Sequence, residues 1–250
     1  MNNTDIKASL ENLRASVKKV GFICAMDCEL DAVTRLFDSV TVQKVGPADF
    51  YLGKICGIDA VASKCGVGKV FAAICTQTMI LSFSPDLIIN TGVAGNLSES
   101  LKIGDVALSC AVVQHDMDTS PLGDPVGLIS GINIIEIKSD LDAALVMQSC
   151  LNDIGINSEI GIIASGDQFV ALSEKKEFIK ETFGAVSCEM EGASVGHVCY
   201  VNDVRFLVVR ALSDDADGAS PEDFPAYCVK VSENSSKAIY AFMKALSQDI

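Results

Sequence analysis

The sequence predicts an α/β fold built on a central, largely buried β-sheet. Short apolar runs rich in β-branched residues alternate along the chain with longer stretches that have helical spacing and no helix breaker. The apolar runs lack a polar alternation, which is typical of strands buried on both faces. No break in composition divides the 250 residues. We therefore expect a helical extension at residues 1–18 and a single domain at residues 19–250.

Each expected element follows from its local pattern. The extension should be a helix, because its apolar residues recur at spacings of four, three and four from Ile6 to Val17. Short β-rich runs between residues 40 and 65, separated by glycines, indicate antiparallel strands. Buried strands are expected at 20–25, 87–90, 106–113, 160–164, 186–191 and 206–212. Helices are expected at 29–37, 69–82, 141–151, from a Ser173 cap onward, at 192–199, and after 221 with Ile239, Phe242, Met243 and Leu246 on one face.

The run of residues 206–212 contains a cation and ends in a cluster of acids. Ser213 and Asp214 follow this run, and open α/β sheets bind ligands at the carboxyl ends of their strands. Acids after a strand are equally typical of a solvated turn or a helix cap. Arg210 favours the ligand-binding interpretation, because a buried charge is costly unless a carboxylate or bound anion lies nearby.

The composition disfavours several classes of protein. The formal charge of −14, from 19 basic and 33 acidic residues, disfavours a nucleic-acid partner, because phosphate backbones are bound by clustered Lys and Arg. No apolar run has the length of about 18 to 20 residues that a membrane span needs. The first residues lack a secretory signal, so we expect no membrane association and a cytoplasmic location. Ten cysteines without a CxxC pair and only two histidines predict reduced core thiols and no metal site. We also expect no cofactor.

Four expected strand ends carry polar or glycine-rich sequence. They lie at residues 27–29, 91–95, 189–191 and 210–214. The glycines at 91–95, considered alone, are equally typical of a plain turn. Strand ends of this kind converge at one edge of a sheet, which would bring Glu29, Glu191 and Asp214 around a single cleft. Paired carboxylates in one cleft can cleave a glycosidic bond, because one protonates the leaving group while another activates water.

Seven motifs, taken in order, resemble those of 5′-methylthioadenosine/S-adenosylhomocysteine nucleosidases, within the wider nucleoside phosphorylase superfamily. They are Ala25-Met26 with Glu29, Gly66-Val-Gly-Lys69, Asn90-Thr-Gly-Val-Ala-Gly95, Leu101-Lys-Ile-Gly-Asp105, Ser165-Gly-Asp167, Glu189-Met-Glu191 and Val209-Arg-Ala-Leu-Ser-Asp214. The resemblance spans about residues 19 to 246. It implies a three-layer α/β/α sandwich with a central twisted mixed β-sheet, and a homodimer that hydrolyses the N-glycosidic bond of a small-molecule adenine thionucleoside.

The resemblance also implies roles for individual residues. Glu29 looks like the general base for the attacking water, and Asp214 looks like the acid that protonates adenine N7. Among the rest, Met190 and Glu191 resemble the ribose-binding pair, and Arg210 resembles a residue that orients the water. The substrate-binding residues implied by the resemblance are Val67, Val93, Ala94, Gly95, Phe169, Val170, Glu189, Met190, Glu191, Arg210 and Ser213, with Phe169 and Val170 against adenine and Val93 to Gly95 under the sugar.

Two departures from the family pattern leave the 5′ substituent open. Val93 stands where many members carry Ser, which removes a hydroxyl near the sugar. The loop 115–130 differs more, with Thr119, Leu122 and Asp124 where the family often closes over the 5′ group from the second subunit. If Asp124 points inward, a substituent more polar than methylthio is favoured.

Two other functions, phosphorolysis and non-catalytic nucleoside binding, occur on the same fold. A purine nucleoside phosphorylase shares the fold but needs cations to bind phosphate. The related phosphorylases place arginines where this chain has Asp27, Glu29 and Thr91, and a carboxylate there would repel phosphate. A non-catalytic nucleoside-binding protein would be expected to lack Glu29 or Asp214, and both are present. Hydrolysis is therefore the expected reaction.

Overall fold

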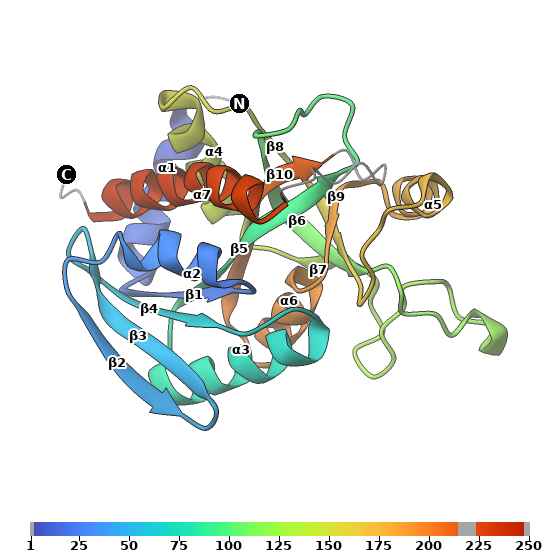
Figure 1. The fold of residues 1–250 in the computed structure, drawn as a ribbon, viewed down its shortest axis with the longest axis horizontal. Helices are drawn as coiled ribbons and strands as arrows, with labels where there is room; N and C mark the ends of the chain where they lie inside the picture. Colours follow the sequence, from blue (N-terminus) through green and yellow to red (C-terminus); the bar gives the residue numbers. More distant parts are fainter. Residues whose placement is uncertain (1–2, 215–223, 248–250) are drawn as a thin grey trace.

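The structure, a computed structural model, describes residues 3–214 and 224–247 (Figure 1). Within them ten strands form one mixed sheet. The strands are β1 (Lys19–Cys24), β2 (Val40–Val45), β3 (Ala48–Ile55), β4 (Ile58–Lys64), β5 (Leu87–Asn96), β6 (Val106–Gln114), β7 (Ile137–Lys138), β8 (Ser158–Ser165), β9 (Ala185–Glu189) and β10 (Arg205–Asp214). The helices are α1 (Asn3–Ser16), α2 (Asp27–Thr34), α3 (Lys69–Phe83), α4 (Leu141–Asp153), α5 (Ser173–Phe183), α6 (Gly192–Val201) and α7 (Phe224–Ser247), with a short 3₁₀ helix η1 (Ser120–Leu122).

The sheet runs in the order β10-β6-β8-β9-β5-β1-β4-β3-β2, with β7 beside β6. β10 pairs in parallel with β5 as well as antiparallel with β6, so the five strands β5, β10, β6, β8 and β9 close into a ring. The expected antiparallel strands between residues 40 and 65 are β2, β3 and β4, which form a meander at the other end of the sheet. β4 then pairs in parallel with β1, so the sheet is mixed.

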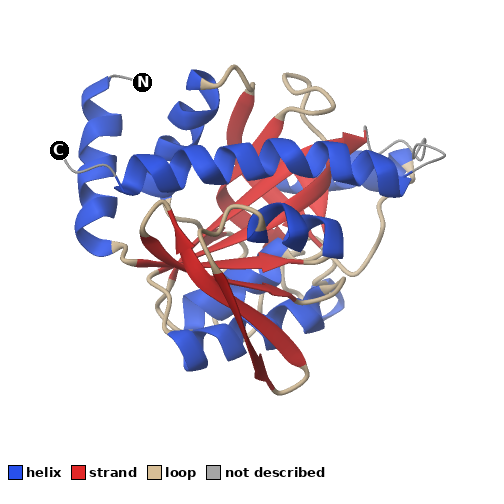
Figure 2. Ribbon diagram, turned by 60° about the vertical axis from the view of Figure 1, so that its left-hand side comes forward, coloured by secondary structure: helices blue, strands red, loops and turns tan. Residues whose placement is uncertain are grey.

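Helices cover both faces of the sheet, which confirms the predicted three-layer α/β/α sandwich (Figures 1 and 2). α1, α2, α4 and α7 pack on one face, and α3 and α6 pack on the other. Successive residues of one strand serve the two layers in turn, as the period of a strand requires. In β1, Phe22 belongs to the cluster under α7, and Ile23 belongs to the cluster over α3.

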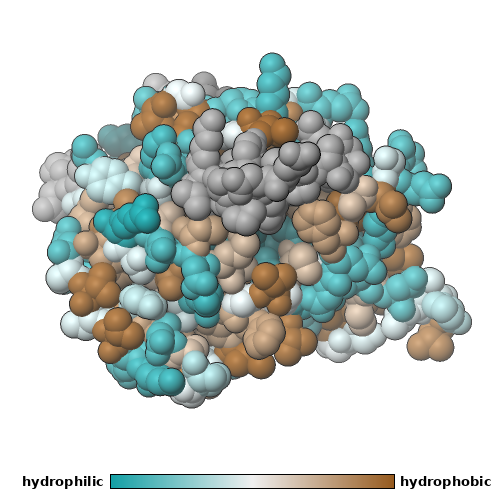
Figure 3. All heavy atoms as spheres, viewed as in Figure 1, coloured by the Kyte–Doolittle hydropathy of each residue, from teal (hydrophilic) through white to brown (hydrophobic). Residues whose placement is uncertain are grey.

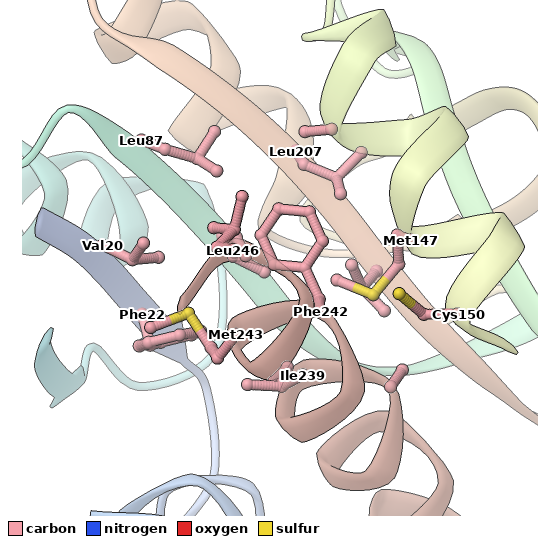
Figure 4. Packing of buried hydrophobic residues seen from close by; sticks show 14 of the residues in the cluster. Val20, Phe22, Leu87, Met147, Cys150, Leu207, Ile239, Phe242, Met243 and Leu246 are labelled. Carbon is pink, nitrogen blue, oxygen red and sulfur yellow. The ribbon is translucent and has the colours of Figure 1, made fainter. Parts of the chain in front are cut away.

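The expected apolar face of the last helix is buried against the sheet (Figure 4). Ile239, Phe242 and Met243 of α7 are each fully buried. They meet strand residues and helix α4, and the labelled members of this cluster are Val20, Phe22, Leu87, Met147, Cys150, Leu207, Ile239, Phe242, Met243 and Leu246. Burial of a large apolar side chain contributes about 1.5 to 3 kcal/mol, so this helix anchors one layer of the sandwich.

The N-terminal helix lies against the domain. Leu13 of α1 and Val17 after it are buried in the same cluster as α4 and α7. Arg14 donates to the carbonyl of Ala245 at 2.8 Å, and Ser9 donates to Asp142 at 2.8 Å. These contacts attach α1 to both neighbouring helices, while the domain boundary near residue 18 stays a prediction.

Several expected boundaries were wrong. β5 extends to Asn96 instead of ending at Asn90, because β10 pairs with it in parallel register as far as Gly95. Ser173 is the first residue of α5 rather than its cap, since the N-cap position is Leu172 and makes no side-chain hydrogen bond. Helix α2 begins at Asp27 and ends at Thr34, before the expected end at Phe37. The two-residue β7 had no sequence pattern to indicate it.

Two further features concern the class of protein. No helix among residues 3–214 and 224–247 combines the length and the apolar composition that crossing a membrane requires. Among the described residues, free thiols are carried by Cys24, Cys56, Cys65, Cys75, Cys110, Cys150 and Cys199. Cys228 lies in α7, outside the side chains that the structure describes.

Candidate active site

A cavity of about 210 Å³ opens where the carboxyl ends of several strands meet. It is lined by Ala25, Met26, Glu29, Val67, Val93, Ala94, Gly95, Gln168, Phe169, Val170, Cys188, Glu189, Met190, Glu191, Arg210 and Ser213. The structure therefore brings together Glu29 and every residue that the sequence predicted to bind substrate. Gln168 and Cys188 were missed, although each directly precedes a predicted site residue. The remaining predicted site residue is Asp214, whose side chain lies outside the described part of the chain.

Glu29 occupies the first turn of α2, where the chain turns directly from β1 into the helix. Its side chain is 3% exposed. Oε2 accepts the backbone N–H groups of Ala25 at 2.8 Å and Met26 at 3.0 Å, and Oε1 accepts the N–H of Val93 at 3.2 Å. Burial raises the pKa of Glu29, although Arg210 and these three N–H groups oppose the shift. The carboxylate is thus held rigidly and is a better proton acceptor than an exposed one.

Gly92 of β5 allows the side chains of Glu29 and Arg210 to approach the strand. A Cβ placed on Gly92 would collide with Arg210 Nη1 and Glu29 Oε1. Only a residue without a side chain fits between these two groups, so this glycine of the expected turn has a packing role inside a strand.

Arg210 is 1% exposed and is surrounded by polar partners. Nη2 donates to Asn90 Oδ1 at 2.5 Å and to Glu189 Oε2, and it lies 3.5 Å from Glu191 Oε2. Burial alone would lower the pKa of Arg210, but the nearby carboxylates raise it above its ordinary value. The carboxylates expected around this buried cation are therefore present. Asn90 was not predicted as a partner of Arg210. Its place as a polar residue inside a buried strand is the signal that could have indicated it.

The two glutamates after β9 differ in how many partners they have. Both oxygens of Glu189 are engaged, by Arg210, Ser165 Oγ and the N–H groups of Glu191 and Gly192. Glu191 is 4% exposed, and its Oε1 accepts the N–H of Gly68 at 2.8 Å. Burial and repulsion from Glu189 raise the pKa of Glu191 to about 7. Glu191 therefore titrates near neutral pH at the wall of the cavity.

The strand β10 ends beside the cavity. Ser213 is 2% exposed and donates to the carbonyl of Ala94 at 3.3 Å. The backbone of Asp214 pairs with Gly95 after an irregularity in the register, so its position lies next to two lining residues. The side chain of Asp214, and the whole of Asp215 and Asp217, lie outside the described part of the chain.

Two exposed apolar side chains line the cavity. Phe169 is 60% exposed and Val67 is 52% exposed, and they follow β8 and β4 respectively. An aromatic ring exposed at a cavity offers a face on which a flat base can stack. Val170, the next lining residue, packs against a third hydrophobic cluster, which includes Ile179 and Phe183 of α5.

The loop with the unusual 5′-side residues does not reach the cavity of its own chain. None of the described lining residues comes from residues 115–131. Thr119 donates to Asp124 Oδ2 at 2.8 Å, so the acid is engaged within the loop. Leu122 in η1 is 84% exposed, on the arm that projects at the lower right of Figure 1. The expectation that Asp124 faces the substrate thus has no support within one chain.

No metal site is visible in the described part of the chain, where no group of three or more His, Cys, Asp or Glu side chains is arranged to hold an ion. The side chains that line the cavity differ in chemical character. They comprise carboxylates, one guanidinium, a hydroxyl and apolar walls.

Comparison with known proteins gives consistent results. The profile of the phosphorylase superfamily matches residues 19–244. The 5′-methylthioadenosine/S-adenosylhomocysteine nucleosidase of Shewanella sediminis is 34% identical over 232 residues, covering 91% of this chain and 100% of its own. A crystal structure of the nucleosidase of that name from Neisseria meningitidis, in complex with methylthio-immucillin-A, is 31% identical with a TM-score of 0.87, covering 91% of this chain and 99% of that one. The futalosine hydrolase of Helicobacter pylori is 34% identical with a TM-score of 0.85, covering 90% of this chain and 97% of that one.

Proposed function

Because the chain belongs to the phosphorylase superfamily and, within it, to the family of 5′-methylthioadenosine/S-adenosylhomocysteine nucleosidases, we propose that it hydrolyses the N-glycosidic bond of these adenine nucleosides. The observation that carries the proposal is one cavity in which a buried, rigidly held Glu29 lies near a ribose-binding candidate, Glu191, and an exposed aromatic wall. The substrate is the small nucleoside itself, and the reaction needs no cofactor.

Glu29 acts as the general base in this proposal. A water molecule attacks the anomeric carbon while Glu29 accepts one of its protons, and the bond between that carbon and N9 of adenine breaks. The transition state resembles an oxocarbenium ion, so the carboxylates around the sugar stabilise the charge that develops there. Arg210 is bound to Asn90 and Glu189, which fixes its guanidinium near Glu29.

Asp214 supplies the proton that adenine N7 gains as the base departs. Its backbone position beside Gly95 and after the buried Ser213 supports this assignment. A donor has to hold a proton until the base leaves, which a partly desolvated carboxyl at a strand end can do. Phe169 and Val170 provide the apolar surface for the base.

Glu191 and Met190 hold the ribose. Glu191 has one oxygen on the N–H of Gly68, and its second oxygen lies 3.5 Å from Arg210 Nη2. An ionised carboxylate in this place can accept hydrogen bonds from both sugar hydroxyls. Glu189 already has partners for both oxygens, which supports a role in holding Arg210 and the start of α6 rather than the sugar itself.

Phosphorolysis is the alternative within the superfamily. Arg210 is the one cation among the described residues that line the cavity, and it already neighbours Glu189 and Glu191. A phosphate dianion beside Glu29 would meet a carboxylate rather than a second cation. This arrangement favours water as the nucleophile.

We further infer a homodimer in which the 115–131 arm completes the partner's site around the 5′ substituent. The arm does not line its own cavity, and the face of α3 exposes Val70, Phe71 and Ile74. In the view of Figure 3, hydrophobic residues gather in the lower part of the molecular surface, over α3. The similarity to a futalosine hydrolase supports a different 5′ substituent as the alternative substrate.

A single assay tests the proposal. Purified protein is incubated with 5′-methylthioadenosine, S-adenosylhomocysteine or futalosine, with and without phosphate, and the released base is separated by HPLC. We expect adenine from the first two substrates at a rate that phosphate does not change. A strict need for phosphate with a ribose 1-phosphate product would show a phosphorylase, and base release from futalosine alone would show the alternative substrate.

A further inference from the structure

Three residues outside the cavity form a closed ring of polar contacts. Lys69 Nζ contacts Asp116 Oδ1 at 2.6 Å. The other oxygen of Asp116 accepts the backbone N–H of Asp167 at 2.8 Å, and Asp167 Oδ1 accepts the backbone N–H of Lys69 at 2.7 Å. Each residue therefore touches the other two, although they come from the start of α3, the turn after β6 and the segment after β8.

One side of the ring fixes the partner of Glu191. Lys69 directly follows Gly68, whose N–H is bound by Glu191 Oε1 at 2.8 Å. The carbonyl of Lys69 accepts from Ser194 Oγ at 2.6 Å, which ties the same turn to α6. Gly68 has φ +100°, and a Cβ there would lie 2.9 Å from Asp167 Oδ1, so glycine is required beside the ring. The backbone N–H of Gly68, which donates to Glu191, is thus held in place by its neighbours.

The other side of the ring fixes the apolar wall of the cavity. Asp167 precedes Gln168, Phe169 and Val170, and residues 167–172 belong to neither a helix nor a strand. Such a segment lacks the ladder of backbone hydrogen bonds that holds a strand in place. The bond from the N–H of Asp167 to Asp116 holds the beginning of this segment.

The ion pair of the ring is more shielded than an exposed surface pair such as Lys54–Asp59. The side chains of Lys69 and Asp116 are 19% and 15% exposed, whereas those of Lys54 and Asp59 are 57% and 53% exposed. Exposed pairs contribute little to stability, while water and salt screen a shielded pair less. Lys69 Nζ also donates to Gln114 Oε1 at 3.2 Å, so the ammonium has two partners.

We propose that Asp116 is a positioning residue. Through Lys69 and Asp167 it fixes the base-stacking residues Phe169 and Val170 and the ribose-binding Glu191 in their positions relative to each other. The proposal rests on the function proposed above for the cavity. Loss of the Asp116 charge would loosen residues 167–172 and the turn at Gly68 together, so substrate would bind less well before the chemistry itself is affected.

The test compares Asp116→Asn with the matched control Asp59→Asn, which removes the exposed pair with Lys54 at the opposite end of β4. Loss of one charge-assisted hydrogen bond corresponds to a rise in the KM for methylthioadenosine of about tenfold or more in Asp116→Asn, while kcat changes less than about threefold. Hydrogen–deuterium exchange of peptides covering 66–69 and 166–172 should become faster in this variant. Neither quantity should change in Asp59→Asn.

A second variant keeps the proposal testable if Asp116→Asn does not fold. Lys69→Gln removes the same pair from its other end and should reproduce the rise in KM and the faster exchange, and Lys69→Arg should restore both. In the double variant the effect should be no larger than in either single one, because both changes open one ring. Unchanged KM and exchange in these variants, or full additivity, would overturn the proposal. A wild-type protein that releases no adenine would instead refute the proposed function, and the exchange measurements would still decide whether the ring holds the two segments.

Discussion

Glu29 and Val93 are joined by a hydrogen bond of 3.2 Å between the carboxylate Oε1 and the backbone N–H, across 64 residues of sequence. The bond ties the first turn of α2 to the middle of β5. It fixes the proposed base relative to the strand that lies beneath the sugar in the proposed complex. The position of this carboxylate is therefore set by the sheet as well as by its own helix.

Replacing Glu29 by Gln should remove turnover while leaving binding. The amide has nearly the same volume but does not accept a proton from water, and general base catalysis contributes a factor of about 10² to 10⁴. We expect kcat for adenine release to fall by that factor, with an unchanged circular dichroism spectrum and retained binding of methylthioadenosine by calorimetry. Near-normal turnover would remove Glu29 from the role of base.

A methyl group on Gly92 should damage the site more than the fold. In Gly92→Ala the new Cβ displaces Glu29 and Arg210, and a small misplacement of catalytic groups can cost about 10² in rate. The matched control is Gly161→Ala in β8, whose Cβ would lie 2.5 Å from a side-chain carbon of Val186. We expect kcat/KM to fall about 100-fold or more in the first variant only, while both lower the melting temperature. Equal kcat/KM values would contradict the packing role of Gly92.

The titration of Glu191 should appear in the pH dependence of KM. Burial and Glu189 raise its pKa to about 7, so the group is mostly protonated below this pH and mostly ionised above it. The ionised form accepts more hydrogen bonds from the ribose, so KM should fall as the pH rises from about 6 to about 8. In Glu191→Gln the KM should be higher and independent of pH in this range. A wild-type KM that rises over the same interval would exclude the proposed contact.

Asp214, rather than Asp215 or Asp217, should be essential. Its backbone pairs with Gly95, a residue that lines the cavity. Asp214→Asn should lower kcat by about 10² or more, whereas Asp215→Asn and Asp217→Asn should stay within about threefold of wild type. Steady-state rates of the three variants decide this, and the opposite ranking would move the acid to another residue.

A charge on the exposed face of α3 should separate the proposed dimer. Ile74 is 53% exposed, and Ile74→Asp would place a carboxylate in the apolar interface at a large cost in desolvation. Light scattering should give twice the chain mass for wild type and a single chain mass for this variant. Val42→Asp on β2 is the matched control, at 57% exposure, and should remain a dimer. A wild type of single chain mass would refute the dimer.

The buried strands were predictable because their apolar runs are short and uninterrupted, as strands covered by helices on both sides must be. This pattern also led to the grouping of Glu29, Glu191 and Arg210, and all three line the same cavity in the structure. The extension of β5 through Thr91 to Asn96 was missed, because glycines usually mark turns and only the pairing with β10 makes this stretch a strand.

Contacts between distant segments left no local pattern in the sequence. The polar partner of Arg210 could be anticipated from the cost of a buried charge, yet the choice of Asn90 depends on the register of β5 against β10. The ring of Lys69, Asp116 and Asp167 depends on three separate segments meeting in space. Spacing along the chain does not encode such an arrangement.

The three backbone N–H groups that bind Glu29 also bear on how the enzyme prepares for its next cycle. These bonds are strongest to a negative carboxylate and weaken when it takes up a proton. Once Glu29 has taken a proton from the water, the three N–H groups would have a weaker hydrogen-bond acceptor. This favours release of the proton from Glu29 to solvent as the products depart. The same amides that orient the base would thus regenerate it, so recovery after each turnover is built into the backbone.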